Sequence, residues 1–141
     1  MNSTNFFQYP TEPEQQETNG NLSFWADQPA EDWRTLLAHG ETLRFAAGDQ
    51  LIAPNQQSDG FYLAAFGRFG MGDIVFEEGE AFGLESFFAK RAYPQAVVAL
   101  EAGEVVLISR TAFETLFAKD PQLGKGVLLE LGRILALKQT I

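Results

Sequence analysis

The sequence predicts a mainly β domain with flanking α-helices, of the jelly-roll type (a double-stranded β-helix), followed by a long C-terminal helix. Short apolar segments alternate with turn residues through residues 41–109. Strands this short, with turn signals roughly every 8–12 residues, are typical of sandwiches, barrels and jelly rolls. One helical pattern precedes this region and two follow it. With 141 residues, of which 45% are hydrophobic, the chain is long enough for one domain with a sizeable core.

The first 22 residues are expected to form a disordered acidic tail, because they combine prolines and polar residues with glutamates and lack any basic residue. The domain then spans residues 23–141. Pro29 and the acidic residues after it predict the first turn of a short helix, and Gly40 is expected to end it.

The strand region is divided by turns at residues 47–49, 55–60 and 101–103. The last turn is expected to join the final pair of strands, and the segment that begins at Phe61 is expected to be buried throughout. The expected strand segments are Leu43–Phe45, Leu51–Ile52, Phe61–Phe66, Phe69–Gly72, Asp73–Phe76, Tyr93–Leu100 and Glu104–Ile108.

Two helices follow the strands. Thr111 and Glu114 have the spacing of a capping box, and Asp120-Pro121 predicts the start of a helix over about residues 121–141. The apolar face of this helix is wide enough to suggest a homodimer seam, with Lys138 as its polar exception. The alternative is a helix that folds back over its own barrel. The expected seam residues are Val127, Leu131, Ile134 and Ile141.

Charge and composition exclude several functions. The chain has 19 acidic and 10 basic residues, a net charge of −9, which would repel a nucleic-acid backbone. No apolar run approaches the roughly 20 residues of a membrane span, so no membrane association is expected. Cysteine is absent and His39 is the only histidine, so neither a metal site nor catalysis is indicated. We therefore expect a cytoplasmic protein that is not an enzyme.

Three motifs occur in a recognisable order: Phe45–Leu51 around Gly48-Asp49, then Asp59–Leu63 with Gly67 after it, then Gly79–Gly83. This order resembles the cyclic nucleotide-binding domain of the Crp/Fnr regulators over about residues 24–141. The resemblance implies the jelly-roll fold, a sensor role and a phosphate-binding cassette that begins at Gly79.

The cassette departs from the family pattern at two positions. Leu84 stands where the family has the glutamate that binds the ribose hydroxyl, and Glu85 comes one residue too late. Tyr93 stands where the family has the arginine that pairs with the cyclic phosphate. Lys90 and Arg91 could compensate for that arginine. The residues of this degenerate cassette are Phe82, Gly83, Leu84, Glu85, Ser86, Tyr93, Gln95 and Ala96.

Two functions remain open. In the first, the chain is a regulatory module that does not bind cyclic AMP in the usual way and acts through dimerisation or a protein partner. In the second, it senses a cyclic mono- or dinucleotide through altered contacts. Because the sequence ends at Ile141 with no helix-turn-helix after the long helix, we expect either a stand-alone module or the sensor half of a Crp/Fnr-type regulator without its DNA-binding domain.

Overall fold

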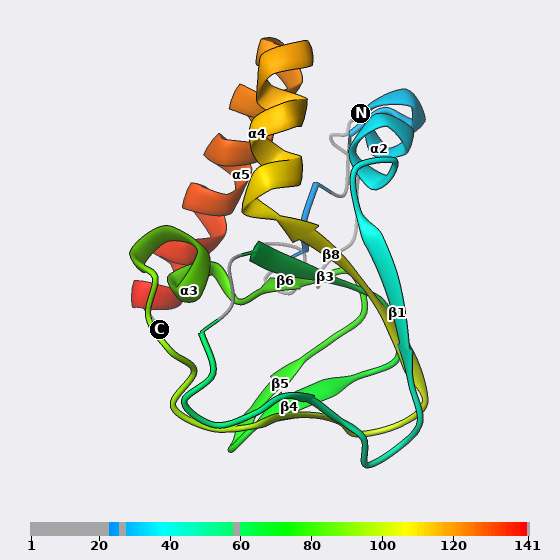
Figure 1. The fold of residues 1–141 in the computed structure, drawn as a ribbon, viewed down its shortest axis with the longest axis vertical. Coiled ribbons are helices and arrows are strands. Elements are labelled where there is room, and N and C mark those ends of the chain that lie inside the picture. The colour runs from blue at the N-terminus through cyan, green and yellow to red at the C-terminus, as the bar shows by residue number, and fades with distance from the viewer. Residues whose placement is uncertain (1–22, 26–27, 58–59, 141) are drawn as a thin grey trace, which may run out of the picture.

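A computed structural model describes residues 23–25, 28–57 and 60–140 of the protein (Figure 1). Its strands form two four-stranded antiparallel sheets, and helices flank the first of them, so the predicted fold class is confirmed. The predicted tail of residues 1–22 and the predicted seam residue Ile141 lie outside the described residues. In chain order the elements are α2 (Ala30–Leu37), β1 (Glu41–Phe45), β2 (Gln50–Ile52), β3 (Gly60–Phe66), β4 (Phe69–Met71), β5 (Ile74–Phe76), β6 (Ala81–Phe82), α3 (Leu84–Ala89), β7 (Val97–Ala99), β8 (Gly103–Ser109), α4 (Arg110–Lys119) and α5 (Pro121–Thr140).

The first sheet has the order β1-β8-β3-β6 and the second has the order β2-β7-β4-β5. Successive residues of β3 point to opposite faces, so Phe61 packs against the helices while Tyr62 packs against the second sheet. Burial on both faces explains the continuous apolar run in this strand. The prediction of a fully buried strand is wrong at its end, where Phe66 is 57% exposed.

The prediction that the last two strands pair with each other is wrong, because β7 and β8 belong to different sheets. β7 pairs with β2 and β4, whereas β8 pairs with β1 and β3. The turn between them carries the chain from one sheet to the other and passes close to Gly67, where an added Cβ would lie 2.7 Å from the Ala102 carbonyl oxygen. Strand β7 is also shorter than expected, since it begins only at Val97, after Pro94, which has no N–H to donate to a ladder.

The predicted cap of α4 is also wrong by two residues. The hydroxyl of Ser109, rather than that of Thr111, accepts the free backbone N–H of Ala112 at 3.1 Å. Ser109 is the last residue of β8, so the strand ends and the helix begins at a single residue. The start of α5 is confirmed, since the Asp120 carboxylate accepts the backbone N–H of Leu123 at 3.1 Å and Pro121 is the first helical residue.

Helix α5 packs over the core of its own domain, so the apolar residues that the sequence assigned to a homodimer seam are buried within one chain. Val127, Leu131 and Ile134 each have 0% exposure and belong to the core that α5 shares with the first sheet and the other helices. Figure 1 shows α4 rising from the end of β8 with α5 beside it, and the C-terminal end of α5 next to α3. The apolar face of α5 is wide because the first sheet, α3 and α4 all pack against this helix within one chain.

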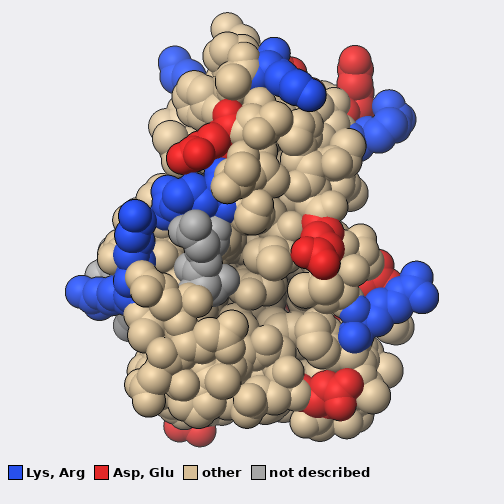
Figure 2. Space-filling view, in the orientation of Figure 1, with Lys and Arg blue, Asp and Glu red and all other residues tan. Residues whose placement is uncertain are grey.

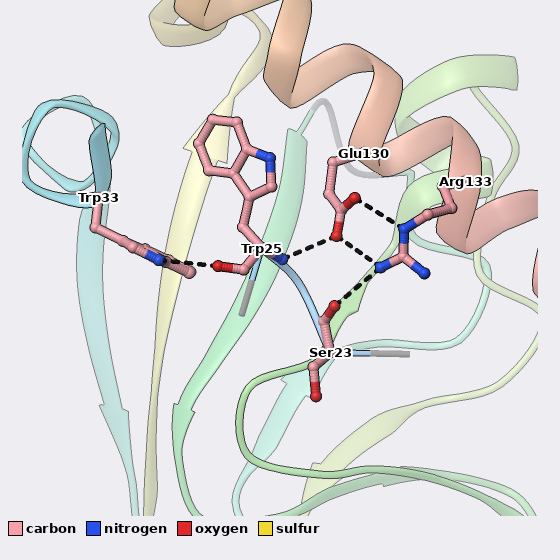
Figure 3. A network of polar contacts seen from close by, with 5 residues as sticks. All are labelled: Ser23, Trp25, Trp33, Glu130 and Arg133. Carbon is pink, nitrogen blue, oxygen red and sulfur yellow. Dashed lines mark hydrogen bonds and ion pairs between the residues drawn. The ribbon is translucent and has the colours of Figure 1, made fainter. Parts of the chain in front are cut away.

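A segment before α2 connects α5 to the β-roll (Figure 3). The backbone N–H of Trp25 donates to the Glu130 carboxylate at 2.8 Å, and the Arg133 guanidinium donates to the Ser23 carbonyl at 3.1 Å. Arg133 and Glu130 also form an ion pair at 2.7 Å. On its other side the segment bonds to the turn before β6, where the Phe24 N–H donates to the Gly79 carbonyl at 2.8 Å. Residues 23–25 therefore link α5 to that turn.

We expect this link to make the protein less stable in acid. The hydrogen bond from Arg133, and secondarily the N–H of Trp25, lower the pKa of Glu130 against the opposing effect of burial. A carboxylate with a lowered folded-state pKa stabilises the fold above its unfolded pKa, and this contribution is lost as the pH falls through the folded value. Glu130→Gln should cost roughly 1 kcal/mol at pH 7. Urea unfolding should show that the difference in free energy of unfolding between the variant and the parent becomes smaller towards pH 3. A difference that stays constant with pH would contradict a stabilising role of the Glu130 carboxylate.

Candidate functional site

A pocket of about 600 Å³ opens between α3, the β4–β5 hairpin, the loop before β7 and the C-terminal end of α5. Five of the cassette residues predicted from the sequence line it, together with the predicted compensating residue Arg91. The structure therefore brings most of the predicted site together in one place. The lining residues are Met71, Ile74, Val75, Phe76, Glu80, Gly83, Leu84, Glu85, Ser86, Arg91, Ala92, Tyr93, Pro94, Leu135 and Lys138.

The entry to α3 requires a glycine. Gly83 has a φ of +81°, a left-handed conformation that favours glycine. A Cβ at this position would also lie 2.2 Å from the Tyr93 hydroxyl oxygen and 3.2 Å from Cδ1 of Tyr62. The glycine thus lets the chain turn into α3 and leaves room for the Tyr93 side chain.

The first residues of α3 point in different directions. Leu84 is buried, with 2% exposure, and packs in the core between the first sheet and the helices. Glu85 is exposed and Ser86 is buried. The side chain at the family's glutamate position is therefore an apolar group fixed in the core, with no polar atom to offer a ligand.

Tyr93 has the most unusual environment of the pocket residues. Its side chain is buried, with 6% exposure, and it packs in the core between the two sheets. Its hydroxyl is the one buried side-chain polar atom among the described residues that has no hydrogen-bond partner. Burial raises the pKa of this hydroxyl well above its usual range, with smaller contributions from Tyr62 and Glu85. It is therefore a neutral group that can donate a hydrogen bond.

The acidic and basic side chains that line the pocket largely balance one another in charge. The Lys138 ammonium lies 5.3 Å from the centre of the Phe76 ring, and burial lowers its pKa against the opposing effect of Glu80 and Glu85. Burial likewise raises the pKa of Glu80, although the Glu77 N–H and Lys138 act in the other direction. With Arg91 included, the lining has two acidic and two basic side chains.

Four of the predicted site residues lie outside the pocket lining. Phe82 is completely buried and stacks on Tyr62 and on Phe76, of which Phe76 lines the pocket. Lys90 ends α3 with an exposed side chain, and the Gln95 side chain lies against Gly72 in the β4–β5 turn. Ala96 is partly buried.

Sequence reasoning missed Lys138 and Glu80 as residues of the pocket. They are 58 positions apart in the chain, and only the tertiary packing of the C-terminal part of α5 brings them to one pocket. One signal could have indicated Lys138, because it interrupts an otherwise apolar helix face. For Glu80 the sequence held no such signal, since it is one of several acids around Gly79.

Other kinds of site find no support in the described part of the chain. No group of three or more histidine or acidic side chains is placed to hold a metal ion there. None of the helices described combines the length and apolarity needed to cross a membrane. Figure 2 shows acidic and basic side chains interspersed on one face, with several basic groups beside α3 and large uncharged areas between them.

Comparison with known proteins identifies the same architecture. The family model described as "Cyclic nucleotide-binding domain" matches residues 42–120, more than half of the chain. No curated protein sequence matches. Among solved structures, a cyclic nucleotide-binding domain from Methylobacillus flagellatus KT is similar, with 20% identity, a TM-score of 0.73, and coverage of 84% of this chain and 72% of that one.

Two regulator structures are also similar. The catabolite activator protein of Thermus thermophilus has 18% identity and a TM-score of 0.66, over 82% of this chain and 59% of that protein's chain. The N-terminal domain of a transcriptional regulator from Streptomyces coelicolor A3(2) has 18% identity and a TM-score of 0.69, over 83% and 88% of the two chains. At these identities the likenesses show a shared fold.

Proposed function

Because the chain belongs to the cyclic nucleotide-binding domain family, whose fold it shares with Crp/Fnr-type sensors, we propose that it is a non-enzymatic regulatory module with a degenerate nucleotide pocket. The pocket does not bind cyclic AMP through the family's usual contacts. The observation that carries this proposal is the burial of Leu84 and Tyr93 at the two positions where the family uses a glutamate and an arginine.

The energetic consequence is large. Arginine's planar fork gives a phosphate two parallel charge-assisted hydrogen bonds, whereas a tyrosine hydroxyl gives one neutral bond. Losing a buried charged contact costs about 2–5 kcal/mol, a large part of the roughly 8 kcal/mol of micromolar binding. Glu80 and Glu85 lie near Lys138 and would add repulsion against an anionic ligand.

Isothermal calorimetry with cyclic AMP, cyclic GMP and cyclic di-GMP tests the proposal. We expect no binding to the parent protein up to about millimolar ligand, which corresponds to about 4 kcal/mol. The double variant Leu84→Glu, Tyr93→Arg should gain measurable affinity for cyclic AMP, provided circular dichroism shows that it is folded. Micromolar binding to the parent with a stoichiometry of one would overturn the proposal.

A second candidate is a sensor that binds a cyclic mono- or dinucleotide through altered contacts, as the sensor half of a regulator. The observation that supports it is that two basic residues, Arg91 and Lys138, line the pocket. In that case the parent binds one of the three nucleotides. Replacing both basic residues with alanine then weakens the binding, and the Leu84→Glu, Tyr93→Arg exchange weakens or alters it.

We further propose that the module works in the cytoplasm as a homodimer or with a protein partner. The predicted seam residues are buried, so a homodimer formed through α5 would use the other face of this helix, where Leu128, Leu129, Gly132 and Ala136 are exposed. Among the described residues, Leu129 is the most exposed large apolar side chain, at 65%. Leu129→Asp therefore tests this face without entering the core.

A further inference from the structure

We propose that the protein's own N-terminal tail, residues 1–22, docks at the pocket and covers its mouth with the aromatic side chains of Phe6, Phe7 and Tyr9. This inference rests on the proposed function, because a nucleotide held in the pocket would compete with the tail for the same space. It is carried by the direction in which the chain leaves the described structure, by exposed apolar side chains at the pocket mouth and by the composition of the tail.

The point where the tail joins the domain lies beside the pocket. Ser23, the first described residue, forms an antiparallel β-bridge with Glu80, and Glu80 lines the pocket. Strand β6 follows directly after Glu80 and stands at the edge of the first sheet. An antiparallel pairing directs the residues before Ser23 along this edge, towards Gly83, which also lines the pocket.

The contacts with α5 give the same direction (Figure 3). The backbone N–H of Trp25 donates to Glu130, whereas the carbonyl of Ser23 accepts from Arg133, which lies three residues closer to the C-terminal end of the helix. Residues 23–25 therefore run antiparallel to α5. Following the chain back from Ser23 leads towards the last turns of α5, where Lys138 lines the pocket.

The mouth of the pocket offers an apolar surface to the tail. Ile74 and Val75 line the pocket from β5, and their exposed fractions are 52% and 40%. Neighbouring large apolar side chains in contact with water favour a partner that removes them from it. Three aromatic side chains within residues 6–9 of the tail supply such a partner.

The charge of the tail also fits this placement. Residues 6–9 are uncharged, so they bring no anion next to the acidic side chains of the pocket. The three glutamates of the tail lie between residues 6–9 and Ser23. Lys90 and Arg91, at the end of α3, are exposed basic side chains beside the pocket, so these glutamates have cations to meet on the outside of the domain.

The tail is long enough to reach the pocket. Tyr9 and Ser23 are 14 positions apart, which allows a span of about 45 Å in an extended chain. Glu80 pairs with Ser23 and lines the pocket, so the distance to be covered is far shorter than this. A tethered segment has an effective concentration of about millimolar, so a dissociation constant below about a millimolar keeps the tail docked.

Paramagnetic relaxation enhancement measured by NMR on the full chain tests the proposal. The chain has no cysteine, so Gln8→Cys gives one attachment site for a nitroxide within the aromatic part of the tail. We expect the backbone amide signals of Ile74 and Arg91, at the pocket, to lose most of their intensity and to regain it when the nitroxide is reduced. The amide signal of Gly48, in a turn outside the pocket lining, should keep its intensity.

Variants of the spin-labelled chain test the contacts. Replacing Phe6, Phe7 and Tyr9 with serine should abolish the loss of intensity at the pocket. Ile74→Asp should weaken it, because a carboxylate then stands at the pocket mouth. Phe66→Asp is the matched control, since Phe66 is 57% exposed and lies outside the pocket lining, and it should leave the loss unchanged. The dispersion of the amide spectrum shows whether each variant is folded.

A mixed sample separates a tail in its own pocket from a tail in the pocket of a second copy. It contains spin-labelled chains without isotope label and isotope-labelled chains without nitroxide. Signal loss in this mixture would overturn the proposal in favour of an exchange between copies. The proposal is also overturned if the pocket amides keep their intensity in the labelled chain, or if the serine replacements leave the loss unchanged. Micromolar cyclic AMP binding to the parent would instead count against the proposed function.

Discussion

Replacing Leu131 with aspartate is expected to unfold the protein. Leu131 has 0% exposure in the core beneath α5, so the substitution removes a buried apolar side chain and places a carboxylate among apolar neighbours. Truncating a buried leucine alone costs about 2–5 kcal/mol. Burying an unpaired charge adds several more, against a total stability of about 5–15 kcal/mol for an ordinary domain. Circular dichroism and urea unfolding of the purified variant should show a loss of at least about 4 kcal/mol.

Leu129→Asp is the matched control, two residues away on the exposed side of the same helix. It should change the free energy of unfolding by no more than about 0.5 kcal/mol. If the protein dimerises through this face, sedimentation should show the variant as a folded monomer. A folded, monomeric Leu131→Asp variant from a dimeric parent would restore the seam predicted from the sequence and contradict the packing of α5.

Gly83→Ala is expected to have the second largest effect. The left-handed backbone at Gly83 costs a residue with a Cβ about 1–2 kcal/mol. The new methyl group would also lie 2.2 Å from the Tyr93 hydroxyl, and such overpacking costs about 1–3 kcal/mol more. Thermal and urea unfolding should therefore show a loss of roughly 2–5 kcal/mol, unless Tyr93 is displaced into the pocket.

Two further variants separate strain from crowding. Gly79 has a similar φ of +91° with nothing within 4 Å of an added Cβ, so Gly79→Ala should show the backbone cost alone. In a Tyr93→Phe background the hydroxyl is gone, so Gly83→Ala should cost about 1–3 kcal/mol less than in the parent. Equal costs in the two backgrounds would mean that the hydroxyl does not lie against Gly83.

The strand segments were predictable because each is marked locally. Glycines and polar turn residues bound the short apolar runs, so β1, β3, β4, β5 and β8 lie close to where the sequence placed them. The pairing of the strands was harder to predict from the sequence, because β7 and β8 are neighbours in the chain but belong to different sheets. The cap of α4 was misplaced because Ser109 and Thr111 are both good cap residues, and the end of β8 decided between them.

The candidate site was predicted in part. The motif order placed Gly83, Leu84, Glu85, Ser86 and Tyr93 in one cassette, and all five line the pocket. Lys138 and Glu80 were not predicted as pocket residues, because they are far apart in the chain and meet only when α5 packs onto the domain. The unpartnered state of the Tyr93 hydroxyl could not be foreseen either, since it depends on every neighbour of that atom.

The sequence by itself determined the fold family, the order of most strands and of the helices at the two ends, and the two substitutions in the cassette. These are encoded locally, in the spacing of apolar, turn and motif residues. Only the tertiary structure decided which partner the apolar face of α5 has, which strands share a sheet and which charges meet in the pocket. An apolar stripe has the same pattern whether it packs against its own domain or a second chain, because the hydrophobic effect is non-directional. The packing of the whole chain selects the partner, and here it buries Val127, Leu131 and Ile134 inside one domain.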